Sequence, residues 1–216
     1  MDTTVVLTSC GRHDLLERTL QSFREFNTYE GIGKILVVED GDGDPGEVCE
    51  RHDADLLRIG RRVGQMQAID LAYAEVRTPY IFHLEDDWEF FRGGFIEKSK
   101  AILNLDPSTL LVWLRSWDDT NGHPLSFRSP EKDFGVLATG YEEVWHGFTF
   151  NPALRRLSDY KRLGSFCARK WEGGPWTDGA AHEVAASQFY HQLGYRAVIL
   201  EAEGYVRHIG YGRHVA

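Results

Sequence analysis

Continuous apolar runs alternate with amphipathic segments through the first half of the chain. The apolar runs cover residues 4–8, 34–38, 80–84 and 110–114, and they are largely unbroken, as in strands buried on both faces. Between them, residues 14–23, 65–74 and 95–105 carry apolar side chains at helical spacing. This alternation predicts an α/β fold with a mixed, mainly parallel central sheet flanked by helices.

Smaller elements complete the expected fold. In the helix at 65–74, the side chains of Ala68, Leu71 and Ala72 should face the core. The second half of the chain is less regular than the first. The further expected elements are a helix at 45–52, a strand at 55–59, a strand end or turn at 148–152, a helix at 152–163, a flexible loop at 171–179, a helix at 180–193 ended by Gly194 and a strand at 195–200.

Composition narrows the class of protein. Hydrophobic residues make up 42% of the chain and charged residues 26%, which is ordinary for a soluble globular protein. The net charge of −9 argues against a protein whose main task is to bind nucleic acid or an anionic membrane, so no nucleic-acid partner is expected. No linker-like stretch divides the 216 residues, which favours a single domain over residues 1–216.

The compartment follows from the cysteines and from the absence of long apolar segments. The three cysteines have no paired spacing, which favours a reducing environment. No apolar run reaches the roughly 18 residues of a transmembrane helix, and the first residues lack the pattern of a signal peptide. We therefore expect a cytoplasmic protein without a transmembrane segment, with peripheral membrane association as an alternative.

An acidic triplet, Glu85-Asp86-Asp87, follows the apolar run at 80–84 directly. Acids at the carboxyl end of a buried strand lie where open α/β sheets bind ligands. Three adjacent carboxylates repel one another unless a cation or a set of donors offsets their charge. A hard divalent metal is the usual solution, and it completes its shell with water and substrate phosphates. The triplet therefore predicts a site for a metal and a diphosphate, with a solvated acidic turn as the alternative.

Four segments, in this order, resemble the GT-A class of nucleotide-sugar glycosyltransferases, and its family-2-like enzymes in particular. They are the first strand with its Arg12 loop, the turn Val37-Val38-Glu39-Asp40-Gly41, the strand ending in Glu85-Asp86-Asp87, which is similar to the DXD motif, and His182-Glu183 followed by Gly194-Tyr195-Arg196. The segment from Gly64-Gln65 to Asp70 is also similar to a family helix, with Asp70 where the family has Asn. The resemblance implies a Rossmann-like GT-A domain with a donor-binding half at about residues 1–115 and an acceptor-binding half at about 116–216.

The resemblance also implies roles for the acids. Asp87 would bind Mn²⁺ or Mg²⁺, while Glu85 or Asp86 would contact the ribose or a metal-bound water. Asp40 would accept a hydrogen bond from the nucleotide base, although Asp-Gly is also a strong turn former. Glu183 would be the general base of an inverting transfer, with Asp178 as the alternative base. The other reading of Glu183 is an acid favoured by the start of a helix.

Further residues are assigned to the same donor site. A histidine near the end of the chain completes the metal shell in several GT-A enzymes, which points to His208, with His214 as a weaker alternative. The remaining candidates would contact the nucleotide. They are Thr8, Ser9 and Gly11 near the base, Arg12 at the base or a phosphate, and Arg62 and Gln65 near the pyrophosphate. Trp145, Trp171 and Trp176 are candidates for sugar stacking, whereas Trp113 should lie in the core.

The sequence therefore predicts a glycosyltransferase of glycan biosynthesis with a UDP- or GDP-linked donor and a glycan, lipid or protein acceptor. One alternative is a nucleotidyltransferase acting on sugar phosphates, but its Gly-x-Gly-Thr-Arg signature is missing at Ser9-Cys10-Gly11-Arg12. Another alternative is a non-catalytic carbohydrate-binding module. Such a module would keep tryptophans but has no need of acids at the end of a strand.

Overall fold

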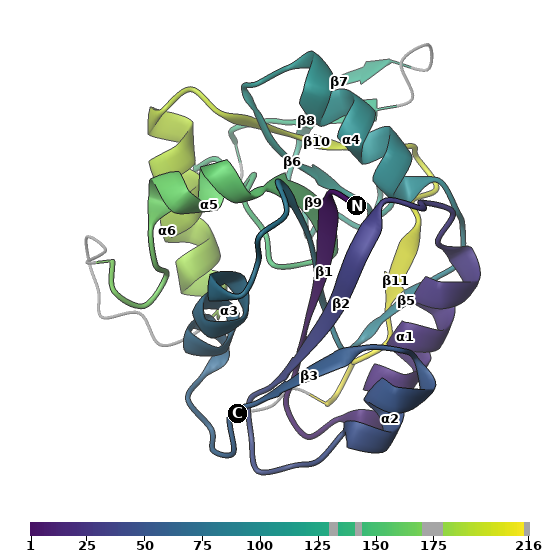
Figure 1. Cartoon of the computed structure of the whole chain (residues 1–216). Coiled ribbons are helices and arrows are strands. Elements are labelled where there is room, and N and C mark those ends of the chain that lie inside the picture. The colour runs from purple at the N-terminus through teal and green to yellow at the C-terminus, as the bar shows by residue number, and fades with distance from the viewer. Residues whose placement is uncertain (130–133, 141–143, 170–178, 214–216) are drawn as a thin grey trace.

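One mixed nine-stranded sheet forms the centre of the protein, as a computed structural model shows for residues 1–129, 134–140, 144–169 and 179–213 (Figure 1). Its strands, in spatial order, are β3 (Asp55–Arg58), β2 (Ile32–Glu39), β1 (Thr3–Ser9), β4 (Tyr80–Glu85), β9 (Ala153–Arg156), β6 (Thr109–Trp113), β10 (Arg196–Ile199), β8 (Phe134–Leu137) and β7 (Leu125–Ser129). The block from β3 to β4 is parallel, as is the β6–β10 pair, which confirms the mixed α/β fold.

Helices cover both faces of this sheet (Figure 1). One face packs against α1 (His13–Phe26), α2 (Gly46–Arg51) and α4 (Phe95–Leu105), and the other against α3 (Gln65–Ala74), α5 (Leu157–Leu163) and α6 (Gly179–Gln192). Because successive strand residues point to opposite faces, each central strand supplies side chains to both cores. None of the described helices is long and apolar enough to cross a membrane.

A second, two-stranded sheet lies beside the first and was not expected from the sequence. Its strands are β5 (Trp88–Phe90) and β11 (Val206–His208), which pair antiparallel with His208 opposite Trp88. Since β5 follows the acidic triplet within a few residues, this pairing brings the far end of the chain back to the end of β4. The position of the acidic turn is therefore fixed by two sheets.

The structure contradicts two local expectations. Leu71 does not face the core, because its side chain is 42% exposed. The segment at 152–163 is not one helix: Ala153–Arg156 form β9, and the helix α5 starts at Leu157. The cause of the second difference is non-local, since residues 153–156 fill the space between β4 and β6 and hydrogen-bond to both.

The tryptophan expectations have mixed outcomes. Trp113 lies in the core, as expected. Trp145 is also buried and donates its Nε1 proton to the Leu137 carbonyl at 3.1 Å, so it is not available to stack on a sugar. Most of the expected loop at 171–179, with Trp171, Trp176 and Asp178, lies outside the described residues, as does His214.

Strands from both ends of the sequence interleave in the main sheet. The strand β9, from the second half of the chain, lies between β4 and β6 of the first half, and β10 lies next to β6. A donor half and an acceptor half divided near residue 115 would thus share one continuous sheet. That division stays a prediction.

Candidate functional site

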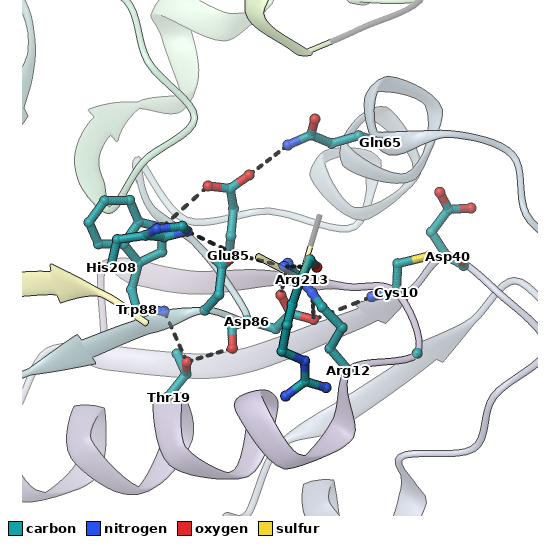
Figure 2. Close-up of polar contacts among 12 residues, drawn as sticks. Cys10, Arg12, Thr19, Asp40, Gln65, Glu85, Asp86, Trp88, His208 and Arg213 are labelled. Atoms are coloured by element: carbon teal, nitrogen blue, oxygen red, sulfur yellow. Dashed lines mark hydrogen bonds and ion pairs between the residues drawn. The ribbon is translucent and has the colours of Figure 1, made fainter. Parts of the chain in front are cut away.

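The acidic turn after β4 is held in place by helix α1. The Thr19 hydroxyl donates to the Asp86 carbonyl at 2.8 Å and accepts from the Trp88 amide at 3.2 Å (Figure 2). One turn further along, Ser22 Oγ accepts from the Phe90 amide at 3.0 Å. Thr19 is fully buried, so water does not compete for these bonds. The backbone that carries Asp86 and Asp87 is therefore rigidly placed.

Arg12, at the start of α1, lies against both aspartates of the turn, and Figure 2 shows it beside Asp86. Its Nη1 donates to Asp87 Oδ2 at 2.7 Å, and its Nη2 forms an ion pair with Asp86 Oδ1. On the other side, His208 Nε2 lies 3.1 Å from the same Asp87 Oδ2. Burial raises the pKa of Asp86 to about 6, although the Arg12 charge opposes this. Burial also acts to raise the pKa of Asp87, but His208 and Arg12 outweigh it and lower that pKa.

Glu85 differs from its two neighbours because no basic side chain pairs with it among the described residues. Its Oε1 accepts from Gln65 Nε2 at 2.7 Å, and its Oε2 accepts from Trp88 Nε1 at 3.3 Å. Burial, with added repulsion from Asp87 and Glu183, raises the pKa of Glu85 to about 8. The raised pKa favours the neutral form of this carboxyl, which reduces the negative charge that the triplet must accommodate.

Asp40, at the end of β2, organises the loop that leads into α3. Its two carboxylate oxygens accept from the amides of Val63, at 2.6 Å, and of Gly64, at 2.9 Å. Gly64 has a φ of +92°, a conformation that glycine adopts without strain. Asp40 thus has the structural role that a turn residue would have. Each carboxylate oxygen has a second lone pair, so Asp40 can accept a further hydrogen bond from a ligand.

A cavity of about 330 Å³ opens at the carboxyl ends of β1, β2 and β4. This is the place where open α/β sheets bind ligands, and the volume is in the range of small-molecule sites. Its lining contains two residues that were not predicted as site residues, Cys10 and Ala68. The expected residues that line it are Thr8, Ser9, Arg12, Asp40, Arg62, Gln65, Glu85, Asp86, Asp87 and His208.

The position of Cys10 in the sequence is enough to predict that it lies at the site, because it directly follows β1 between two expected site residues. Its thiol donates to the Asp40 carbonyl at 2.8 Å. Gly11, by contrast, does not line the cavity. With a φ of +67°, it turns its amide toward Glu39 Oε1, to which it donates at 2.8 Å, and so shapes the loop from behind.

Glu183 lies on α6, outside the lining of the cavity. Its Oε1 accepts from the Phe150 amide at 2.6 Å and from the Thr149 hydroxyl at 2.9 Å. Burial raises the pKa of Glu183, although these two donors and the charge of Arg155 oppose that effect. The negative charge of Glu183 helps to raise the pKa of Glu85, so Glu183 lies on the side of the site where Glu85 is found. Its role as a base stays a prediction.

The residues around Asp87 fit a divalent cation with few protein ligands. Over the part of the chain that the structure describes, no group of three or more His, Cys, Asp and Glu side chains could hold a metal by itself. Asp87 Oδ1 is nevertheless buried without a hydrogen-bond partner in those residues. Gly210 lies so close that a Cβ there would overlap the Asp87 carboxylate. Asp87 and His208 would supply an oxygen and a nitrogen ligand, leaving the other positions to phosphate and water.

The comparisons with known proteins identify the fold. No family model and no curated protein matches the sequence. Among solved structures, S. aureus TarS 1-349 matches with a TM-score of 0.65 and 11% identity over 95% of this chain. The mannosyltransferase PcManGT from Pyrobaculum calidifontis, in complex with GDP-Man and Mn²⁺, matches with a TM-score of 0.66 and 16% identity over 94% of this chain. A structure of S. aureus TarS matches with a TM-score of 0.61 and 11% identity over 95%.

This chain spans 60%, 55% and 36% of the length of those three structures, respectively. At such low identity the likeness shows the fold and not the activity. The expected GT-A fold is confirmed.

Proposed function

From the GT-A fold as a premise, we propose that this protein transfers a sugar from a nucleoside-diphosphate donor to an acceptor hydroxyl. The observation that carries the proposal is the cavity at the carboxyl ends of β1, β2 and β4. It combines Asp40 on one side with Arg12 and the Asp87–His208 pair on the other. Binding a nucleoside diphosphate requires a hydrogen-bond acceptor for the N–H groups of its base and a charged region for its phosphates.

The residues that line the cavity would bind different parts of the donor. Thr8, Ser9 and Asp40 would receive the base, and Arg12 and Arg62 would contact the diphosphate, for which the guanidinium fork is suited. Gln65 already holds Glu85 and would keep that carboxyl oriented toward the ribose. Asp87 and His208 would hold Mn²⁺ or Mg²⁺. Such a cation offsets the negative charge that develops on a departing diphosphate.

Glu183 is our proposed general base. A carboxylate held by Thr149 and Phe150 has a fixed orientation, and its raised pKa makes it a better proton acceptor than an ordinary surface glutamate. A base on the face opposite the leaving diphosphate would give inversion in one displacement. The acceptor hydroxyl of a glycan, lipid or protein would then approach from the α6 side.

Thermal unfolding with a panel of nucleotides tests the proposal. We expect UDP or GDP, with Mn²⁺ present, to raise the midpoint by about 5–10 °C at about 100 times Kd, since such a concentration adds about 2.7 kcal/mol. The neighbour solved with GDP-Man and Mn²⁺ supports this choice of ligands. The panel contains UDP, GDP, dTDP and CMP, each with and without Mn²⁺.

Two variants sharpen the same test. Asp87→Asn should remove the Mn²⁺-dependent part of the shift, because it removes the proposed ligand charge. Asp42→Asn, at an exposed position of the turn after β2, is the matched control and should behave like the wild type. A shift that is independent of Mn²⁺, or no shift with any of the nucleotides, contradicts the proposal.

A further inference from the structure

Arg12 and the proposed metal ion would compete for one carboxylate, that of Asp87. Asp87 Oδ2 accepts from Arg12 Nη1 at 2.7 Å and lies 3.1 Å from His208 Nε2, so both of its lone-pair directions are occupied (Figure 2 shows Arg12 and His208). The guanidinium also bonds Asp86, so its one positive charge lies against both aspartates of the turn. Among the arginine and lysine side chains of the described residues, Arg12 is the one that pairs with these two carboxylates.

The other charges near the turn do not replace Arg12. Arg213 is bound by Asp14 on the surface, and it reaches Arg12 through its carbonyl oxygen, which accepts from Nη1 at 3.2 Å. Asp87 Oδ1 remains as a buried oxygen for which the described residues supply no hydrogen-bond partner. A divalent cation bound at that oxygen would lie close to the guanidinium, and like charges at such a distance repel strongly in a site with little water.

We propose that Arg12 leaves Asp87 and moves to the donor diphosphate when the cation binds, and that it thereby couples the binding of cation and diphosphate. This inference rests on the proposed function. Without a diphosphate, Arg12 stays between Asp86 and Asp87 and opposes the cation. With a diphosphate present, the phosphate oxygens offer the fork two acceptors, and the carboxylate is released to the metal.

The consequence is a specific form of cooperativity. A nucleoside diphosphate should tighten Mn²⁺, and Mn²⁺ should tighten the diphosphate by the same factor, because binding linkage is reciprocal. Arg12 is then the residue that makes the protein respond to the two ligands together, and free Mn²⁺ alone occupies the site weakly. A residue that only held the loop would not produce this coupling.

Mn²⁺ titrations followed by electron paramagnetic resonance test the inference without any turnover. In the absence of nucleotide, Arg12→Gln should bind Mn²⁺ about tenfold more tightly than the wild type, the effect of about one charge-assisted hydrogen bond and its charge. With UDP or GDP added, the factor by which the nucleotide tightens Mn²⁺ should be smaller in Arg12→Gln than in the wild type, and what remains is the contribution of phosphate oxygens that bind the metal directly.

Arg18→Gln is the matched control. Arg18 lies on the same helix and is half exposed, its nearest acid is Glu89 at 3.4 Å, and its loss removes the same formal charge. Its Mn²⁺ affinity should equal that of the wild type. Arg12→Lys keeps the charge but cannot span both aspartates, so it should tighten Mn²⁺ about threefold, and it serves if Arg12→Gln does not fold.

The possible outcomes separate the two ideas. Equal or weaker Mn²⁺ binding by Arg12→Gln, or by Arg12→Lys if that variant carries the test, overturns the inference even if nucleotides bind as proposed. If no nucleotide binds to the wild type, the proposed function fails together with the coupling, whereas the Mn²⁺ titration alone still shows whether Arg12 opposes the cation. Tighter Mn²⁺ binding in Arg12→Gln, together with a reduced nucleotide effect, supports the inference.

Discussion

The Glu183 carboxyl is held by its neighbours in a way that leaves a neutral substitute possible. In Glu183→Gln the amide oxygen can still accept from the Phe150 amide and the Thr149 hydroxyl, so the fold and the donor cavity should be preserved. The substitution removes the proposed general base, and we expect sugar transfer to fall by about 10²–10⁴-fold. Nucleotide binding with Mn²⁺ should remain at the wild-type level. Transfer rates and thermal shifts are measured on the same preparation.

Asp159→Asn serves as the comparison, because Asp159 is a buried acid that contacts Arg156 and Tyr195 and not the site. It should lower stability and leave the rate per folded molecule unchanged. Retention of transfer in Glu183→Gln would remove Glu183 from the mechanism. The anomeric configuration of the product, observed by proton NMR, tests inversion separately.

At the scale of single residues, the sequence is informative where function depends on position along a strand. Asp40 directly follows β2 and Asp87 lies two residues after the end of β4. Strand ends meet at one edge of a parallel sheet, so their shared cavity could be predicted. The partnership of Arg12 with Asp86 and Asp87 could not, because it joins residues far apart in the sequence. Nor does the sequence show that Glu183 lies outside the lining of the cavity.

At the scale of elements, α1 holds the acidic turn through Thr19. Thr19→Val keeps the shape of the side chain but removes the hydroxyl that bonds Asp86 and Trp88, which should lower the free energy of unfolding by about 1–3 kcal/mol. Because the turn carries the proposed cation ligand, Mn²⁺ affinity should also fall. Chemical unfolding and Mn²⁺ titration are the two measurements.

Two further variants separate stability from placement of the turn. Thr19→Ser restores the hydroxyl and should recover Mn²⁺ affinity. Ser22→Ala loses its bond to Phe90, one turn away, and should lower stability while Mn²⁺ affinity stays unchanged. If Thr19→Val and Ser22→Ala affect Mn²⁺ alike, then Thr19 has only a general structural role.

Three of the strands that the sequence did not predict, β5, β9 and β11, share a physical cause. The strand β9 has the residues Ala153-Leu154-Arg155-Arg156, which favour a helix when isolated. They form a strand because β4 and β6 on either side offer unpaired backbone groups. Similarly, β5 and β11 are short, and each is stabilised by a partner from the other end of the chain. Local patterns carry no information about such pairings.

At the scale of the whole molecule, His83 links stability to pH. This side chain is fully buried on β4, and neither ring nitrogen has a partner in the described residues. Burial, aided by the charge of Arg155, lowers its pKa well below 6.5. Below about pH 6.5 the unfolded chain binds a proton at this position and the folded chain does not, so stability falls as the pH falls. This residue should contribute about 1.4 kcal/mol per pH unit.

Urea unfolding between pH 5 and pH 6.5 measures this slope. In His83→Phe, which keeps an aromatic ring beside Tyr73 and Phe150, the dependence on pH should be flatter by up to that amount. His191→Phe is the control, because His191 is exposed and stacks on Trp145, a contact that phenylalanine preserves. Equal slopes for His83→Phe and the wild type would show that His83 becomes charged within the fold.

The place of β9 in the main sheet determines the order in which the protein can be assembled. β4 and β6 come earlier in the chain, yet they are not neighbours in the sheet, because β9 must be inserted between them. Until residues 153–156 arrive, two bare strand edges face each other, and bare edges bind other strands. Thr149 and Phe150, which hold Glu183, lie just before β9, so the position of the proposed general base depends on closing this gap. A growing chain can therefore form the part of the cavity made by β1, β2 and β4 before β9 is in place, whereas His208, which also lines the cavity, arrives last.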